Sequence, residues 1–389
     1  MVTRDEIEGR LERLRRALRE GGLDGVILIH PVDIYYYSGT RQNGALWAPA
    51  DGPSLLLVRK SLARAREEAT AGEVRPFPPG KELAALLPAS ALRVGMTFDV
   101  VPVQQHQYYA RLLPGRELVD VSELNRTLRS VKSPWELERL AEAGARTCEV
   151  FAEVPRFLRP GMREVDLAAE FEYRLRKAGG EGYVRMRAFN QELFHGLAVA
   201  GGAGAVPGFF DGAVTGTGLS SAAPHGASRS VIERDVPVMV DYTGIFDGYI
   251  VDMTRLFVCG RLDDELARAF AAALAIQDWL VERLVPGAIC EELFAGAAAQ
   301  AEASGFGAHF MGAPGENARF VGHGVGLELD ELPVLAQGFK KPLVAAQTIA
   351  IEPKFVFPGR GVVGIENTFA VGEQGGVKLT AYPDDLIPV

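Results

Sequence analysis

The chain has 389 residues, of which 48% are hydrophobic and 23% are charged. This composition is typical of a folded protein and excludes wholesale disorder, and the length suggests two domains. Acidic residues number 50 against 41 basic ones, which gives a net charge of −9. We therefore expect no broad basic surface for nucleic acid or anionic lipid.

The cysteines and the N-terminal segment indicate the compartment. Cys148, Cys259 and Cys290 are too few for a disulfide framework, and their spacing is not that of a zinc or iron–sulfur site. We expect core thiols in a reducing environment. Residues 1–20 are charged throughout, so they resemble neither a signal peptide nor a membrane anchor. The sequence thus predicts a cytoplasmic protein that does not bind a membrane.

The first third of the chain alternates helical and strand patterns. Thr3 and Glu6 have capping-box spacing, and apolar residues then recur every three or four positions until Gly21 and Gly22, which predicts a helix. Strands are expected at 26–29, 55–58 and 92–98, and further helices near 60–70 and 102–113. This alternation predicts an α/β domain over residues 1–130.

A second domain is expected over residues 131–389. The segment 133–136, Ser-Pro-Trp-Glu, has the N-cap and proline of a helix start. Pro-Gly pairs at 160–161 and 286–287 each lead into a helix, and each half then contains a β-hairpin with two acidic residues. We expect two similar α+β halves related by a pseudo-twofold axis. Chance recurrence of the Pro-Gly pairs is the alternative.

The first hairpin spans residues 236–258. Asp247-Gly248 is a strong two-residue turn, and it places Asp241 opposite Thr254 with Asp252 on the same face. Both aspartates interrupt apolar runs, where a charge is costly to bury alone. A cation is therefore expected beside them, and a solvated strand face is the alternative.

The second hairpin repeats the pattern with Glu352 and Glu366. If residues 359–361 form a three-residue loop, Glu352 lies opposite Thr368 and shares a face with Glu366. A two- or four-residue loop would separate the glutamates unless a bulge intervened. The alternative to a ligand role is a core ion pair with a cation of the same hairpin, Lys354 or Arg360.

His323 lies between the hairpins, flanked by Gly322 and Gly324, so another group can approach it closely. Four carboxylates and one imidazole suit a pair of divalent cations such as Mn²⁺, Fe²⁺, Co²⁺ or Zn²⁺. Two such ions would hold a bridging water as hydroxide and polarise a substrate oxygen. The pattern favours hydrolytic chemistry.

On these motifs the chain resembles the pita-bread metallopeptidases, which include methionine aminopeptidases, Xaa-Pro aminopeptidases and prolidases. Residues from 131 onward resemble the catalytic domain, and the first 130, with the motif DIYYYSGT, resemble the creatinase/prolidase N-terminal domain. The resemblance implies two metal ions, Mn²⁺ foremost, and a homodimer. The ligands it implies are Asp241, Asp252, His323, Glu352 and Glu366. It further implies that His225 contacts substrate and that Glu352 handles the proton of the bridging water.

Two positions depart from the family pattern. Typical peptidases carry a second histidine in H-G-x-G-x-x-x-H-E-x-P, where this chain has Asp330. An ionised aspartate accepts but does not donate hydrogen bonds, so it cannot stabilise a tetrahedral intermediate as histidine does unless it is protonated. Asp330 is retained as a candidate catalytic residue by its position in the motif. Prolidase-like members often place an arginine, suited to a substrate carboxylate, where this chain has Gly364. Standard Xaa-Pro dipeptidase activity is therefore in question.

The glycine-rich segment 198–218 matches neither a dinucleotide fingerprint nor a P-loop, so we predict no nucleotide binding and expect it to line the site entrance. For Phe209 and Phe210 we favour core packing over a substrate wall. Arg185 and Arg187 are expected either to bind a substrate anion in place of the missing arginine or to lie exposed.

The sequence thus predicts a dinuclear metal-dependent hydrolase that cleaves the N-terminal residue of short peptides, with Xaa-Pro peptides among its expected substrates. A metal-dependent lyase or hydrolase of a small non-peptide substrate is the second hypothesis, motivated by Asp330 and Gly364. A non-catalytic binding scaffold is the third, and the complete set of five ligands counts against it.

Overall fold

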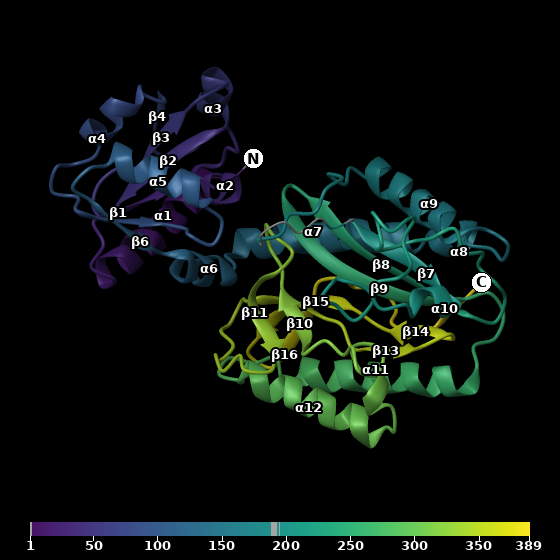
Figure 1. Cartoon of the computed structure of the whole chain (residues 1–389). Coiled ribbons are helices and arrows are strands. Elements are labelled where there is room, and N and C mark those ends of the chain that lie inside the picture. The colour runs from purple at the N-terminus through teal and green to yellow at the C-terminus, as the bar shows by residue number, and fades with distance from the viewer. Residues whose placement is uncertain (1, 188–192, 194) are drawn as a thin grey trace. The chain divides into compact units, whose positions relative to one another are not determined.

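The computed structural model describes residues 2–187, 193 and 195–389. The chain forms two compact units. The first runs to Arg129 and also includes Arg187, and the second begins at Ser130. Figure 1 shows the elements of each unit. No helix among the described residues is long and apolar enough to cross a membrane, and all three cysteines are free and buried.

The first unit is built on a six-stranded mixed sheet with the strand order β4-β3-β2-β1-β5-β6. Its strands are β1 (Gly25–Leu28), β2 (Gly44–Pro49), β3 (Leu55–Val58), β4 (Glu73–Pro76), β5 (Arg93–Met96) and β6 (Glu117–Asp120). The helices of this part of the chain are α1 (Arg4–Glu20), α2 (Pro31–Ser38), α3 (Leu62–Glu68), α4 (Leu83–Leu86), α5 (Val103–Leu112) and α6 (Ser122–Ser130). The α/β expectation is confirmed, although β2, β4, β6, α2, α4 and α6 were not predicted.

The second unit contains three sheets, with the strand orders β17-β9-β8-β7, β11-β10-β12-β15-β16 and β13-β14. Its helices are α7 (Pro134–Phe151), α8 (Val154–Phe157), α9 (Glu164–Lys177), α10 (Gly201–Gly204), α11 (Asp264–Glu282) and α12 (Cys290–Ala303). Its strands are β7 (Gly196–Ala200), β8 (Pro237–Phe246), β9 (Tyr249–Val258), β10 (Phe320–Gly324), β11 (Glu331–Ala336), β12 (Thr348–Ile351), β13 (Lys354–Phe357), β14 (Gly361–Gly364), β15 (Asn367–Gly372), β16 (Gly375–Lys378) and β17 (Ile387–Pro388).

These elements form two halves, as the sequence predicts. Helices α7 and α9 pack on the β7–β8–β9 sheet, while α11 packs on β13, β14 and β16, and α12 packs on β10 and β11. In Figure 1 the sheets lie between the two helix pairs. Gly161 and Gly287 both have a φ angle of 90°, in the left-handed region that favours glycine. The α+β pita-bread architecture is therefore confirmed.

The turn of the first hairpin is as predicted. Asp247 and Gly248 join β8 to β9 with φ angles of 49° and 84°, so both residues adopt the left-handed backbone of a tight hairpin turn. Asp241 pairs with Thr254. Since alternate residues share a face, Asp252 lies on the same side of the ribbon as Asp241 and Thr254.

The turn of the second hairpin begins one residue earlier than predicted. Lys354 pairs with Gly364 and Phe357 with Gly361, so the loop is 358–360. Thr368 consequently pairs with Ala350, and its predicted pairing with Glu352 is wrong. Pro358 cannot donate a ladder hydrogen bond, and Gly359 takes a φ angle of 76°. The missing N–H of Pro358 and the left-handed backbone of Gly359 both favour a turn that begins at the proline.

Candidate metal centre

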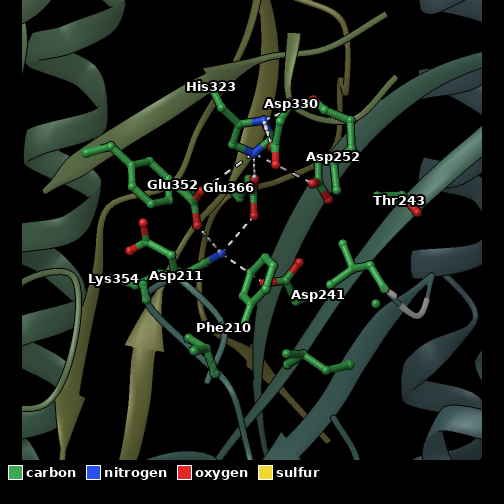
Figure 2. Close-up of a pocket in the computed structure, with 18 of the residues that line it drawn as sticks. Phe210, Asp211, Asp241, Thr243, Asp252, His323, Asp330, Glu352, Lys354 and Glu366 are labelled. Atoms are coloured by element: carbon green, nitrogen blue, oxygen red, sulfur yellow. Dashed lines mark hydrogen bonds and ion pairs between the residues drawn. The ribbon is translucent and has the colours of Figure 1, made fainter. Parts of the chain in front are cut away.

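The two hairpins and β10 bring the five predicted ligands into one pocket of about 300 Å³ (Figure 2). Asp241 lies on β8, Asp252 on β9 and His323 on β10, whereas Glu352 follows β12 and Glu366 precedes β15. His225 and Asp330 also line this pocket. In the corrected register β12 pairs Ile351 with Asn367. Glu352 and Glu366 are the next residue on each strand, so they face each other across the hairpin.

His323 directs its two ring nitrogens to different surroundings. Nδ1 lies 3.2 Å from the carbonyl oxygen of Leu329 and 3.4 Å from Asp330 Oδ1. Both neighbours are acceptors, so Nδ1 carries a proton. Nε2 is therefore left facing three carboxylates. Its distances to their nearest oxygens are 3.5 Å for Glu352, 3.7 Å for Glu366 and 3.9 Å for Asp252.

Lys354 provides the second cationic group of the site. Its Nζ donates hydrogen bonds at 2.8 Å to Asp241 Oδ2, Glu352 Oε2 and Glu366 Oε2. The side chain is only 3% exposed. The core ion pair considered as an alternative is therefore present for this lysine. Arg360 instead pairs with acidic groups outside the pocket, Asp263 and Glu265.

The carboxylates differ in their affinity for protons. Burial raises the pKa of Glu352 to about 7 and, helped by the charge of Glu366, raises the pKa of Asp252 well above its usual range. Burial also raises the pKa of Asp241, although Lys354 opposes this. For Glu366 burial acts in the same direction, but Lys354 and His323 outweigh it and lower the pKa to about 2. The cluster is thus short of positive charge.

The residues present fit a divalent cation beside His323. Asp252, His323 and Glu366 each offer a ligand atom, and these atoms lie within 4.8 Å of one another. Glu366 Oε1 is buried and accepts no hydrogen bond from any described residue. His323 Nε2 lies 3.7 Å from this oxygen, too far for a hydrogen bond. A buried acceptor without a hydrogen bond is costly, and a metal cation at this position would satisfy it. Oxygen and imidazole ligands suit Mn²⁺, Fe²⁺, Co²⁺ and Zn²⁺.

One wall of the pocket is formed by the loop after α10. His225 is buried, which lowers its pKa, and its ring centroid lies 5.3 Å from that of Phe210. Phe210 lines the pocket, whereas Phe209 is 69% exposed. The predicted core packing of the two phenylalanines is wrong. Because this segment is an irregular loop, neighbouring rings on it do not both reach the core. The expected lining role of the glycine-rich segment is confirmed.

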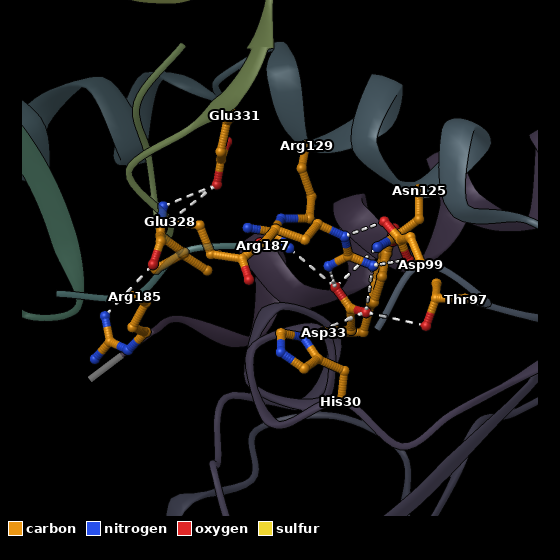
Figure 3. Close-up of polar contacts among 12 residues, drawn as sticks. His30, Asp33, Thr97, Asp99, Asn125, Arg129, Arg185, Arg187, Glu328 and Glu331 are labelled. Atoms are coloured by element: carbon orange, nitrogen blue, oxygen red, sulfur yellow. Dashed lines mark hydrogen bonds and ion pairs between the residues drawn. The ribbon is translucent and has the colours of Figure 1, made fainter. Parts of the chain in front are cut away.

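Neither Arg185 nor Arg187 has the place predicted for it. Arg185 donates at 2.9 Å to the carbonyl oxygen of Gly248 and pairs with Glu181. Arg187 belongs to the first unit, where it pairs at 3.0 Å with Asp33, a buried carboxylate also held by Arg129 (Figure 3). Their side chains are only 10% and 2% exposed. Local acidic partners thus exclude both the substrate-anion role and solvent exposure.

Three further pocket residues were not singled out from the sequence. Thr243 lies two residues after Asp241 on β8 and therefore shares its face, a period-two signal that could have identified it. Asp211 and His195 line the pocket from loops. No periodic pattern reports on loop positions, so the sequence offered no signal for these two residues.

Comparison with known proteins agrees with this architecture. Residues 138–373 match the model of metallopeptidase family M24, and residues 10–131 match that of the creatinase/prolidase N-terminal domain. The first match covers more than half of the chain. The protein therefore belongs to metallopeptidase family M24, and it is a metallopeptidase-like hydrolase.

Relatives match over almost the whole chain. An Xaa-Pro dipeptidase of Pyrococcus furiosus is 27% identical over 382 residues, which are 97% of this chain and 99% of the relative. A probable dipeptidase, PepE, of Mycobacterium tuberculosis is 29% identical over 98% of this chain and 96% of its own length. Among solved structures, an Xaa-Pro dipeptidase of Bacillus anthracis is 25% identical with a TM-score of 0.84, covering 98% of this chain and all of that one.

Proposed function

We propose that this protein is a metal-dependent aminopeptidase that removes the N-terminal residue from short peptides, including peptides with proline in the second position. The observation that carries the proposal is the convergence of the five predicted ligands on one buried pocket. The dipeptidase relatives support the same class of reaction.

In this proposal the chain's own residues orient the peptide and the attacking water. A divalent cation held by Asp252, His323 and Glu366 would supply Lewis acidity. Glu352 lies beside that group, with Oε1 3.5 Å from His323 Nε2, so it can accept the proton of an attacking water. His225 is neutral at neutral pH, because burial lowers its pKa, and it can donate or accept a hydrogen bond at the substrate.

The charge of the pocket favours the positively charged end of a peptide. Asp211 and Asp330 line it in addition to the four clustered carboxylates. Lys354 is the only lysine or arginine among the described lining residues, and its ammonium is already hydrogen-bonded to three carboxylates. A free dipeptide carboxylate would therefore lack a cationic partner. We infer that tripeptides and longer peptides are better substrates than dipeptides.

Other features remain proposals that rest mainly on the resemblance. We propose a division into domains 1–130 and 131–389, Mn²⁺ as the first candidate metal, and a cytoplasmic homodimer. The three free, buried cysteines suit a reducing compartment. Two ions with a bridging hydroxide, as the resemblance implies, would require Lys354 to leave the oxygens that it now contacts.

The test is a peptide panel with metal-stripped protein reloaded with Mn²⁺, Co²⁺, Fe²⁺ or Zn²⁺. Xaa-Pro dipeptides, Xaa-Pro tripeptides and proline-free tripeptides are compared, for the unaltered protein and for Asp330→His. Metal-dependent release of the first residue, faster for tripeptides, supports the proposal. No cleavage of any peptide by the unaltered protein contradicts it.

One observation favours a second function, a metal-dependent lyase or hydrolase of a small non-peptide substrate. Asp330 lies 3.4 Å from His323 Nδ1, so a carboxylate stands where a typical peptidase places a second histidine. Activity on peptides that appears only in Asp330→His would favour this function. A screen of small carboxylates and amides that shows no metal-dependent turnover would count against it.

A further inference from the structure

The centre contains two neighbouring cation positions that share their carboxylates. Glu366 directs Oε1 toward His323 and Oε2 toward Lys354. Glu352 does the same, with Oε1 3.5 Å from His323 Nε2 and Oε2 2.8 Å from Lys354 Nζ. Figure 2 shows Lys354 and His323 on opposite sides of these two glutamates. One cation position thus lies beside His323, and the ammonium group of Lys354 occupies the other.

The ammonium of Lys354 is saturated and held in place. An ammonium has three donors, and here each has a carboxylate acceptor at 2.8 Å, on Asp241, Glu352 and Glu366. Thr254 adds a hydrogen bond at 2.9 Å to the same Glu366 oxygen. In the described structure the carboxylate of Asp241 therefore accepts a hydrogen bond from Lys354 and makes no contact with His323.

The backbone also accommodates this lysine. Lys354 pairs with Gly364 across the β13–β14 ladder. A Cβ atom at position 364 would lie 2.6 Å from Lys354 Cγ and 2.7 Å from its Cα, closer than real Cβ contacts. Gly364, the residue found where the resemblance led us to expect an arginine, thus leaves room for the lysine. The lysine at position 354 and the glycine at position 364 therefore depend on each other.

We propose that Lys354 replaces the second divalent cation, so that the centre is completed by a single metal ion bound at Asp252, His323 and Glu366. The proposal rests on the metal dependence proposed above and revises its stoichiometry. Two divalent ions together with Lys354 would place three cations around shared oxygens, and their mutual repulsion opposes this arrangement. One ion and the ammonium supply positive charge at both positions.

The experiment is a count of metal ions per chain. Unaltered protein, Lys354→Met and Arg360→Met are loaded with excess Mn²⁺, desalted and analysed by plasma mass spectrometry, with circular dichroism to verify folding. Methionine keeps the length of lysine without its charge. Arg360 is the matched control, since it is the other cation of the same hairpin and lies outside the pocket. We expect about one ion per chain for the unaltered protein and the control, and about two for Lys354→Met.

Two aspartate variants test the proposal without altering the lysine. Asp252→Asn removes a proposed ligand, so bound Mn²⁺ should be lost. Asp241→Asn removes a carboxylate bonded to Lys354, so about one ion should remain. The electron paramagnetic resonance spectrum of the unaltered protein should be that of isolated Mn²⁺ rather than an exchange-coupled pair. Two ions in the unaltered protein, or loss of the ion in Asp241→Asn, would overturn the proposal.

The result is independent of the peptide assay, because no substrate is present. A protein that binds one ion but cleaves no peptide retains this inference and loses the proposed function. A protein that cleaves peptides with two bound ions retains the function and loses the inference.

Discussion

The carboxylate of Glu164 allows a quantitative test of how the pocket wall is held. Glu164 is fully buried at the start of α9. It accepts hydrogen bonds at 2.7 Å from the backbone N–H of Ala200, and at 2.8 and 2.5 Å from the N–H and hydroxyl of Ser228. It therefore ties the end of β7 to the loop that carries His225.

Glu164→Gln should destabilise the second unit by about 3–5 kcal/mol. Glutamine keeps one acceptor oxygen, but its NH₂ group must face either Ala200 or Ser228, both of which donate. A lost charge-assisted bond costs about 1.5–3 kcal/mol, and the buried donor left without an acceptor adds about 1–3 kcal/mol. With an m value of about 3 kcal/mol/M, the urea midpoint should fall by about 1–1.7 M.

The assay is urea unfolding of the full chain, followed by circular dichroism and by tryptophan fluorescence, to which Trp135 and Trp279 of the second unit contribute together with Trp47 of the first. Glu170→Gln is the matched control on the same helix, because Glu170 is half exposed and pairs with Arg174. We expect this control to change stability by less than about 0.5 kcal/mol. A Glu164→Gln midpoint within error of the unaltered protein would refute the reasoning.

Three further predictions concern acid, packing and metal. Burial opposes ionisation of Asp33, but Arg187 and Arg129 outweigh it and hold its pKa well below the usual range. The ionised carboxylate therefore stabilises the first unit fully above about pH 5, and this contribution is lost progressively as the pH falls below about 4. Acid unfolding of Asp33→Asn should lack this pH-dependent contribution. Gly364→Ala should lower the free energy of unfolding by about 1–3 kcal/mol, because the added Cβ would clash with Lys354. An unchanged urea midpoint would argue against that close approach. Removal of metal by a chelator should abolish activity and remove about 2.7 kcal/mol of the stability measured at a hundredfold excess of metal over its Kd; equal melting temperatures with and without metal would contradict this.

Local chemistry made parts of the fold predictable. Thr3 accepts from the N–H of Glu6, and Ser133 forms a complete capping box with Glu136, so two helix starts followed from capping alone. Asp247-Gly248 fixed the register of the first hairpin because its geometry requires left-handed backbone. In each case the signal lies within a few residues of the feature that it specifies.

The remaining features depend on neighbours that are distant in the sequence. The sequence offered Lys354 only as one of two possible ion-pair partners, since its contact with Asp241 joins residues 113 positions apart. Phe209 is exposed although its neighbour Phe210 lines the pocket, and composition cannot separate them. The two-residue turn was located correctly. The three-residue loop has the predicted length but begins one residue earlier, at Pro358, because the prediction placed the turn at the Gly-Arg-Gly segment and did not include the proline.

The assignment of Arg187 to the first unit has a consequence for protein engineering. This arginine is separated from Arg129 by 57 residues of sequence, yet its guanidinium bonds to Asp33 and Asp99. The N-terminal unit is therefore not assembled from one continuous segment. A chimera made by joining a foreign N-terminal module at Ser130 would inherit Arg187 without its acceptors. Such a graft should succeed only if the donor module carries acidic residues at the equivalent positions, or if Arg187 is replaced together with it.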